Sequence, residues 1–438
     1  MVKQLVRAFE YAVPDPFIFA VGLTLLTAAL AFGFAPHHAP GEVLAGWYKG
    51  IFDILQFALQ MILILVTGYA LAGSPPVARL LQRLAALPKN GKDAVTLTFL
   101  VSALACWLNW GFGLVVAALL AREIAKRLQI DFGWLVAAAY SGFLIWASGP
   151  SSSIALAQAT PGSKLNIVQS LTGHVLPISS TIFTRFNVVP CIVLVVVLAI
   201  VFRAVEPADA VYANPAAGDD APVPTRIQPQ HTLAARLNDA WILNVILALA
   251  GFGYVISTWI SGGFSLDINL VIFIFFCAGL LLHWRPRAYV AAINDAARIT
   301  GPLIVQYPIY GGIMGIMTAT GLAGVIAAGF DSFSNAHTLP FWNYIASIFI
   351  SLFVPSGGGH WAVQGPFAVP AAVKMHASLP ATAMAVAMGE QVANMIQPFW
   401  ALPILAIAGV GLQRVMAFTA IAFVTALVIF GLSLLLLI

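Results

Sequence analysis

The chain has 438 residues, of which 61% are hydrophobic and only 8% are Asp, Glu, Lys or Arg, with a formal net charge of +4. Soluble domains carry about 25% charged residues, so this chain has too few charges to cover a core in water, and we expect its solvent to be a lipid bilayer. The composition excludes a soluble enzyme, a nucleic-acid-binding protein and a disordered scaffold for the chain as a whole, and the small basic excess fits loops at an anionic leaflet.

Eleven apolar segments meet or approach the roughly 20 residues that a helix needs to cross a bilayer. In chain order they are 17–34, 51–71, 94–121, 135–158, 175–202, 241–260, 264–284, 302–328, 341–373, 381–410 and 415–438. These segments predict an all-α polytopic membrane protein in a bacterial-type inner membrane. The cysteines, Cys106, Cys191 and Cys277, lie in such segments without the spacing of a metal or redox site, so we expect buried apolar side chains.

The third segment, 94–121, has Lys and Arg on both flanks, in RLLQRLAALPKNGK before it and AREIAKR after it. Basic loops stay on the cytoplasmic side, so both ends should lie on that side. We therefore predict a re-entrant hairpin rather than a span. Its turn falls at Asn109-Trp110-Gly111-Phe112-Gly113. The candidate substrate contacts at this tip are Asn109, Gly111 and Gly113.

The next segment, 135–158, is interrupted by Ser148-Gly149-Pro150-Ser151-Ser152-Ser153. Proline removes a backbone donor and kinks a helix, which frees carbonyl groups about one turn earlier. We predict a broken helix here. Its candidate substrate contacts are Ser148, Ser151 and Ser152.

The segment 206–236 contains five prolines and four acidic residues, which predicts a cytoplasmic linker. It divides the chain into 1–205 and 237–438, and we predict that these halves are inverted-topology repeats. An ungapped offset of 247 aligns Gly68 with Gly315, Gly111 with Gly358, and Gly142 with Gly389.

The segment 341–373 has no basic residue on its first flank, FDSFSNAHTLP, and only Lys374 after it. This opposite flank charge predicts a second re-entrant hairpin of opposite orientation, with its turn at Pro355-Ser356-Gly357-Gly358-Gly359. A helix that begins after the tip would favour an anion at its N-terminus. The candidate substrate contacts are Ser356, Gly357, Gly358, Gly359, His360 and Gln364.

The second broken helix is predicted over 381–410, around Gly389-Glu390-Gln391 and Gln397-Pro398. Glu390, Asn394 and Gln397 are spaced i, i+4, i+7 and so share one face, which should point at protein or at a cavity. We assign Glu390, Gln391 and Gln397 to ion coupling and Asn394 to substrate binding. Hydrogen bonding between helices is the alternative role for this stripe.

With two hairpins, nine full crossings remain. A cytoplasmic N-terminus then places all but four of the 20 basic residues inside: Lys49, Lys164 and Lys374 fall outside, and Arg185 lies near the outer end of a span, where an interfacial arginine is the expected role.

Several motifs together resemble the short-chain fatty acid transporter family, the acetoacetate and butyrate permeases. They are VPSGGGHWAVQGP, WLNWGFG, SGPSSSIALA and GEQVANMIQPFWALP. The resemblance runs from residue 17 to near the end. It implies uptake of small monocarboxylates driven by a proton or sodium gradient, in a superfamily with paired re-entrant hairpins. A sodium ion would then lie near Asn109, Ser356 and Asn394.

We therefore expect an ion-coupled symporter for a small carboxylate, with no cofactor and no nucleic-acid partner. The carboxylate would be held by backbone N–H groups near Gly357–Gly359 and Gly111–Gly113, and Trp110, Trp146, Trp361 and Phe143 would line an apolar slot. The alternatives are a passive anion channel and an intramembrane serine hydrolase built on Ser148 and His174. The sequence leaves open the chain length of the substrate, the coupling ion, the direction of transport and a homodimer.

Overall fold

The computed structural model describes residue 11 and residues 14–163, 165–207, 210–212, 233–263, 268–298 and 300–438. Within these residues the regular structure is helical, and the one isolated β-bridge pairs Asp131 with Tyr212. The expectation of an all-α protein is therefore confirmed. Most of the predicted linker, 213–232, lies outside the described residues.

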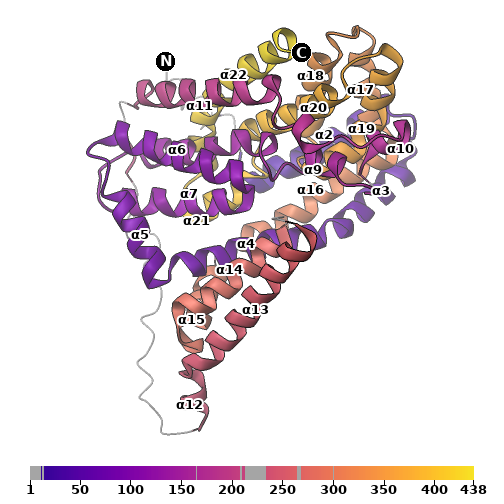
Figure 1. Ribbon diagram of the computed structural model, residues 1–438. Coiled ribbons are helices and arrows are strands. Elements are labelled where there is room, and N and C mark those ends of the chain that lie inside the picture. Colours follow the sequence, from indigo (N-terminus) through magenta and orange to yellow (C-terminus); the bar gives the residue numbers. More distant parts are fainter. Residues whose placement is uncertain are drawn as a thin grey trace.

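The helices alternate between long apolar rods and short connecting pieces (Figure 1). Those of the first half are α2 (Pro16–Phe34), α3 (Pro40–Asp53), α4 (Leu55–Ala72), α5 (Pro75–Ala85), α6 (Gly91–Leu108), α7 (Trp110–Ala125), α8 (Phe132–Ser141), η1 (Gly142–Ser148), α9 (Ser153–Ala159), α10 (Ile167–Thr172), η2 (Ile178–Ser180) and α11 (Arg185–Ala204). Those after the linker are α12 (Leu233–Asn238), α13 (Trp241–Gly262), α14 (Ile268–His283), α15 (Pro286–Ala297), α16 (Gly301–Thr320), α17 (Leu322–Asp331), α18 (Leu339–Ser351), α19 (Gly357–Met375), α20 (Leu379–Ala393), η3 (Asn394–Ile396), α21 (Ala401–Ala408) and α22 (Leu412–Leu436).

Eight helical segments of the described residues are long and apolar enough to cross a membrane. They are Pro16–Phe34, Pro40–Ala72, Gly91–Leu108, Phe132–Ala159, Arg185–Ala204, Trp241–Gly262, Leu379–Ala408 and Leu412–Leu436. Their length and composition make this a multi-pass membrane protein. The count of nine crossings, the re-entrant depth of the hairpins and the side of the N-terminus stay predictions.

Each segment predicted as a hairpin consists of two helices. In the first, α6 and α7 are joined at Asn109 and pack against each other, and a Cβ at Gly113 would overlap Cys106 (Figure 1). In the second, residues 352–356 join α18 to α19. Each hairpin is followed by a helix that is broken and almost completely buried: α8–η1–α9, and α20–η3–α21.

Three helix boundaries differ from the expected ones. The second segment starts at Pro40 rather than at 51, because proline is compatible with the first helical position and the Glu42 carboxylate accepts from the Ala39 N–H. The helix expected from 175 begins only at Arg185, an exposed residue as predicted. The segment 302–328 divides at Gly321, whose φ of 74° ends α16.

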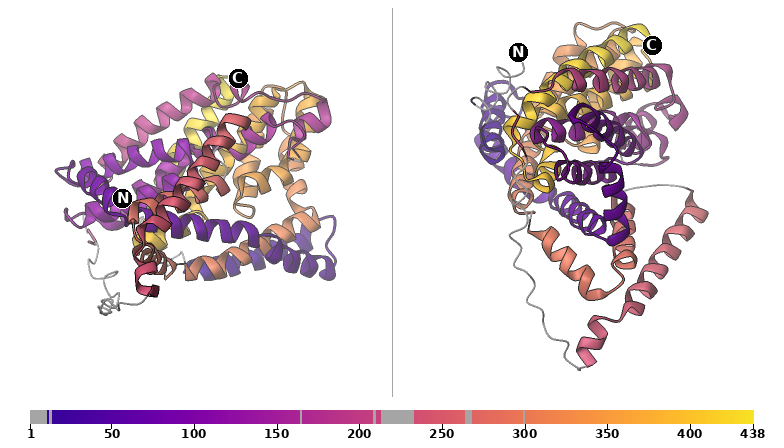
Figure 2. Two further views of the ribbon diagram at one scale, coloured as in Figure 1. Left: turned by 60° about the horizontal axis from the view of Figure 1, so that its bottom comes forward. Right: turned by 90° about the vertical axis from the view of Figure 1, so that its left-hand side faces the viewer.

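Two features that the repeat pattern did not predict shape the molecule. Helices α13, α14 and α15 project from the body as an arm (Figures 1 and 2). An ion pair between Asp131 and Arg414 joins the start of α8 to the start of α22, and Asp131 also accepts from the Val211 N–H beside the linker. Breaking a buried ion pair leaves one charge uncompensated, so this contact ties the two halves together.

Candidate functional site

The first hairpin tip satisfies its own backbone N–H groups. The Asn109 carboxamide oxygen accepts from the N–H of Gly111 at 3.1 Å and of Phe112 at 3.0 Å, and its backbone carbonyl accepts from Gly113. The N–H of Trp110 donates to Ser151 Oγ at 3.3 Å. The side chain of Asn109 therefore acts as the N-cap of α7, and the predicted carboxylate contact at Gly111–Gly113 finds no free donor in this structure.

The second hairpin tip is open. Ser356 occupies the N-cap position of α19, but its hydroxyl caps no backbone N–H. Gly357, Gly358 and Gly359 form the first helical turn, where N–H groups have no partner within the helix. No other described residue accepts from these three N–H groups. This tip, unlike the first, presents unpaired donors and the positive end of a helix dipole to a ligand.

The glycines of the second tip are helical rather than part of the turn, and none has a positive φ. Their role is close packing instead. A Cβ at Gly357 would lie 2.8 Å from the Trp146 ring, and one at Gly359 would lie 2.9 Å from Met314 Cε. At Gly358 the nearest neighbour would be Leu165 Cδ1 at 3.4 Å, so a methyl group fits there.

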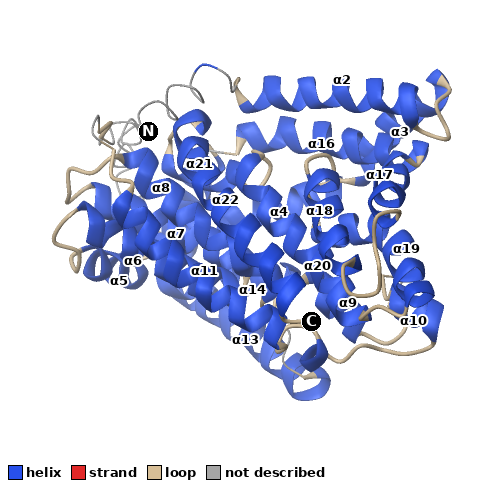
Figure 3. Ribbon diagram, turned by 90° about the horizontal axis from the view of Figure 1, so that it is seen from above, coloured by secondary structure: helices blue, strands red, loops and turns tan. Residues whose placement is uncertain are grey.

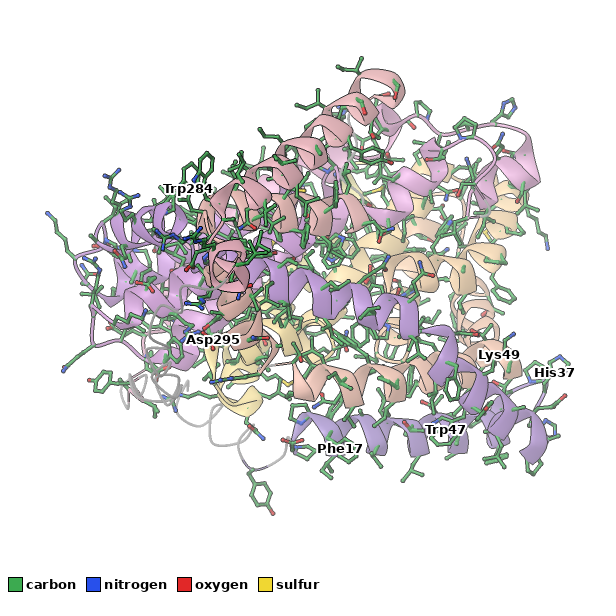
Figure 4. All side chains as sticks on the ribbon, turned by 90° about the horizontal axis from the view of Figure 1, so that it is seen from below. Phe17, His37, Trp47, Lys49, Trp284 and Asp295 are labelled. Atoms are coloured by element: carbon green, nitrogen blue, oxygen red, sulfur yellow. The ribbon has the colours of Figure 1, made fainter. Side chains whose placement is uncertain are left out.

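A cavity of about 340 Å³ opens beside the second tip. Its walls are Ser356 together with residues of α3, α4 and α16, and the lining side chains include Lys49, Asp53 and Phe57. Figure 3 shows α3 beside α16 along one edge of the molecule, and Figure 4 shows Lys49 near His37 at one end of that edge. A volume of this order is typical of pockets for small ligands.

Sequence reasoning missed Lys49 and Asp53, because it placed Lys49 in an external loop and began the span two residues before Asp53. Two signals mark the longer helix: Pro40 followed by Glu42 at its start, and the spacing of Gly46, Gly50 and Asp53 along one face. With the helix extended to Pro40, both charged residues lie inside it.

His360 and Gln364 form a buried network inside the second hairpin instead of lining the cavity. The His360 Nε2 atom lies 2.7 Å from Gln364 Oε1 and 3.2 Å from Ser347 Oγ. Gln364 Nε2 donates to the Asn343 carbonyl at 3.0 Å. These contacts hold α18 and α19 together, so in this conformation both residues have a packing role rather than a contact with the cavity.

Glu390 is fully buried in α20, and neither of its carboxylate oxygens has a hydrogen-bond partner among the described residues. The Nδ2 atom of Asn394, one turn later and close enough to interact with Glu390, also lacks a hydrogen bond. Gln397 Nε2 donates to Asn394 Oδ1 at 3.0 Å. An unpaired carboxylate is costly to bury, so this arrangement calls for a proton or a cation at Glu390.

Gln391 has the opposite environment. Its Nε2 donates to Ser148 Oγ at 3.0 Å and its Oε1 accepts from the Ala147 N–H at 3.1 Å, so it joins the two broken helices. Ser152 caps α9 by accepting from the Ala155 N–H. The predicted roles of these residues in transport stay predictions, but each has a structural contact in this conformation.

An aromatic cluster lies between the two broken helices. Trp400 is its centre, with ring centroids 5.0 Å from Trp110, 5.3 Å from Phe143 and 6.1 Å from Trp146. Phe57, which also lines the cavity, lies 5.8 Å from Trp400. Trp361, which was predicted to line the same slot, is outside this cluster, and its indole N–H donates to the Leu165 carbonyl. The cavity therefore borders the aromatic cluster at Phe57.

Sequence reasoning did not find two tyrosines of α16 that also join this cluster. Tyr307 and Tyr310 lie with ring centroids 4.7 Å and 5.1 Å from Phe399, and both hydroxyl groups are buried without a partner among the described residues. Their segment was predicted only as a span. Two tyrosines in an apolar helix are the signal that could have found them, since a buried tyrosine hydroxyl usually has a partner.

The two halves contain similar contacts at or near the offset of 247. Ser102 Oγ donates to the Ala139 carbonyl, and Ser347 Oγ donates to the Val386 carbonyl. The carbonyl positions, 139 and 386, differ by 247, whereas the serine positions, 102 and 347, differ by 245. Trp110 of the first half contacts Trp400 of the second. Gly357 lies 247 residues after Trp110, Ser153 lies 247 residues before Trp400, and a Cβ at Gly357 would contact Ser153. The contact is thus exchanged between the halves.

The geometry does not support the serine hydrolase. Ser148 Oγ is bonded to Gln391, and the exposed His174 has its backbone N–H bonded to Thr172 Oγ1. No hydrogen bond joins His174 to Ser148 among the described residues. Membrane-length helices around a small-ligand cavity, with buried polar groups where two helices break, define instead a multi-pass membrane transporter.

The comparisons with known proteins give the family. The model of the short chain fatty acid transporter family matches residues 1–437, and the chain belongs to this family. A protein of Escherichia coli (strain K12) named "Putative short-chain fatty acid transporter" is 41% identical over 99% of this chain and 98% of its own. A protein of Haemophilus influenzae with the same name is 39% identical over 96% of each chain. This is a transporter of the bacterial inner membrane and not an enzyme.

Solved structures are more distant. The YdaH transporter of Alcanivorax borkumensis is 13% identical, with a TM-score of 0.46 over 96% of this chain and 97% of its own. MtrF of Neisseria gonorrhoeae, described as illuminating a class of antimetabolite efflux pumps, is 16% identical, with a TM-score of 0.39 over 98% and 97%. Likeness at this level establishes neither a common fold nor a common activity.

Proposed function

We propose that this protein is a secondary active transporter that moves small monocarboxylates, such as acetoacetate and butyrate, together with protons or sodium ions. The observation that carries the proposal is the open second tip. Ser356 lines the cavity at the start of α19, and the N–H groups of Gly357, Gly358 and Gly359 have no partner among the described residues. A carboxylate fits such a helix N-terminus, and the adjacent Phe57 offers apolar surface to a short chain.

The proposed architecture is a pair of inverted repeats, each with a re-entrant hairpin and a broken helix. The exchanged contact at the offset of 247 supports it, because a two-fold relation between the halves makes each contact occur twice. The flank charges support opposite orientations of the two hairpins. The proposed topology has a cytoplasmic N-terminus and nine crossings.

The coupling site is proposed at Glu390 and Asn394, because both carboxylate oxygens of Glu390 and the Nδ2 atom of Asn394 are buried without a hydrogen-bond partner among the described residues. A proton on Glu390, or a sodium ion held by its carboxylate, would remove the cost of burying an unpaired charge. Asn109 and Ser356 belong to different tips, and Asn109 already caps α7. We therefore place the coupling ion at Glu390 rather than at the tips.

Uptake by purified protein in proteoliposomes tests this function. Labelled acetoacetate and butyrate are supplied while a proton gradient or a sodium gradient is imposed separately. Accumulation above equilibrium under one gradient is the expected result. Equilibration without accumulation under either gradient would favour the passive channel, and no uptake of either acid would exclude this substrate class.

The Ser356→Ala variant tests the tip. It removes one hydroxyl group, worth about 0.5–1.5 kcal/mol net, so KM for butyrate should rise up to about tenfold with little change in protein yield. Ser257→Ala is the matched control, since Ser257 lies exposed on the α13 arm and bonds only the Tyr254 carbonyl of its own helix. An unchanged KM in Ser356→Ala would remove this hydroxyl from the site.

A further inference from the structure

Two exposed charged residues of α3, Lys49 and Asp53, border the face of this helix that packs against α16. Lys49, Asp53 and Phe57 follow one another at intervals of four residues. Gly46 and Gly50 are also four residues apart and lie three residues before Lys49 and Asp53, so all five lie on one side of the α3–α4 segment. All five line the cavity of about 340 Å³. The opposite wall is formed by α16, through Gly311, Met314, Gly315 and Thr318.

Glycines hold these two helices in direct backbone contact. A Cβ at Gly50 would overlap the Gly311 carbonyl oxygen, and one at Gly315 would overlap the Gly46 carbonyl oxygen. Both helices thus present glycines four residues apart to each other, the arrangement that allows the closest approach of membrane helices. Because Lys49 immediately precedes Gly50, this packing fixes the backbone of Lys49 beside the cavity, while its exposed side chain is free to reach a ligand there.

Lys49 and Asp53 are one turn apart, yet they form no ion pair with each other, and no other described residue pairs with either of them. An ionisable residue inside a membrane helix that faces a cavity is expected to serve transport. Lys49 is the only cationic side chain lining this cavity. Its ammonium group can therefore supply the positive charge that stabilises a carboxylate in this largely apolar cavity.

We infer that Lys49 selects the anion: its ammonium group binds the substrate carboxylate in the cavity, beside Ser356 and the open end of α19. This inference rests on the proposed function and deepens it. The ligand is a small monocarboxylate anion, bound by Lys49 at its charged end, while its short chain contacts Phe57. Asp53, of the same sign as the substrate, opposes binding and limits how tightly the anion is held.

Two charge variants with opposite expected effects test this assignment. In Lys49→Gln, KM for butyrate should rise about tenfold or more, while kcat stays within about twofold, because a charge-assisted bond to the substrate is lost. In Asp53→Asn, KM should fall or stay unchanged, because a repulsive charge is removed. Lys49→Arg should keep KM within a few-fold of wild type. Initial uptake rates in proteoliposomes give both constants.

A second measurement does not depend on transport. Thr318→Cys, on the opposite wall of the cavity, is labelled with a methanethiosulfonate reagent in purified protein. Saturating butyrate should slow this labelling when Lys49 is present, and slow it much less when Lys49→Gln is combined with Thr318→Cys. Butyramide, which has the same chain without a charge, is the control ligand and should not compete for the site.

The outcomes separate this inference from the proposed function. If wild-type protein takes up neither acid, the proposed function fails. If wild-type protein transports butyrate but Lys49→Gln has an unchanged KM, or Lys49→Gln leaves the protection of Thr318→Cys by butyrate unchanged, the role of Lys49 is overturned alone. An equal rise of KM in Lys49→Gln and Asp53→Asn would also overturn it, because the two charges would then act only together on the packing of α3.

Discussion

Glu390 and Gln391 are adjacent in the sequence but differ in what surrounds their side chains. Gln391 donates and accepts across to the first broken helix, at Ser148 and Ala147. Glu390 has the same length and the same burial but no bonded partner among the described residues. The Gln391 amide, with both its donor and its acceptor hydrogen-bonded, makes the contact between the halves rigid. The Glu390 carboxyl group has no such bond and is free to bind and release a proton or cation during a transport cycle.

The Glu390→Gln variant tests this difference. The amide cannot carry a proton or pair with a cation, so accumulation of butyrate against its gradient should be lost. Exchange of internal for external butyrate should survive if Glu390 carries the proton, because exchange moves no net proton. If Glu390 binds sodium instead, half-maximal uptake should need a higher sodium concentration. Wild-type accumulation in this variant would exclude Glu390 from coupling and leave it a packing role.

At the scale of elements, the two hairpin tips have the same outline but different chemistry. Asn109 closes the first tip on itself, and Ser356 leaves the second open. The difference lies in side-chain orientation, since the Asn109 oxygen accepts from the N–H groups two and three residues on and the Ser356 hydroxyl accepts from none. Of the two tips, we therefore assign the substrate carboxylate to the second.

The contact between α3 and α16 carries a prediction of its own. Gly50→Leu places a branched side chain where the Gly311 carbonyl lies, so the helices must separate and the cavity wall with them. The melting temperature in detergent should fall, by an amount that corresponds to about 1–3 kcal/mol, and uptake should be lost. Gly22→Leu on α2 is the control, because nothing lies within 4 Å of a Cβ at Gly22. Equal melting temperatures for the two variants would contradict the close contact.

At the scale of the whole molecule, the inverted repeat predicts on which side of the membrane each hairpin begins and ends. Cysteines introduced at Gly91 and Gln129, the two ends of the first hairpin, should react only from the cytoplasmic face, and one at Ser378 only from outside. The native cysteines are buried and should stay silent to a membrane-impermeant thiol reagent. If Gly91 and Gln129 react from opposite faces, the first hairpin is a full crossing.

Local chemistry explains which parts of the fold could be predicted. The tip at Asn109 and the breaks at Ser148–Ser152 and Gln397–Pro398 come from capping residues, glycines and prolines, which act on their own stretch of backbone. The early start of α3 was missed because polar residues near its N-terminus lowered its hydropathy, although Pro40 and Glu42 marked it.

The sequence by itself determined a helical membrane protein, because long apolar segments and a scarcity of charge leave no other solvent for the chain. Its motifs, by resemblance, indicated the short-chain fatty acid transporter family, which the family match confirms. Only the tertiary structure decided which groups are free to bind. Asn109 and Gln391 find their partners within the protein, whereas the first turn of α19, Glu390 and Lys49 find none among the described residues. The physical reason is that a polar group finds its hydrogen-bond partners among neighbours that folding brings together from distant parts of the chain. Those neighbours cannot be read from the local sequence around the group.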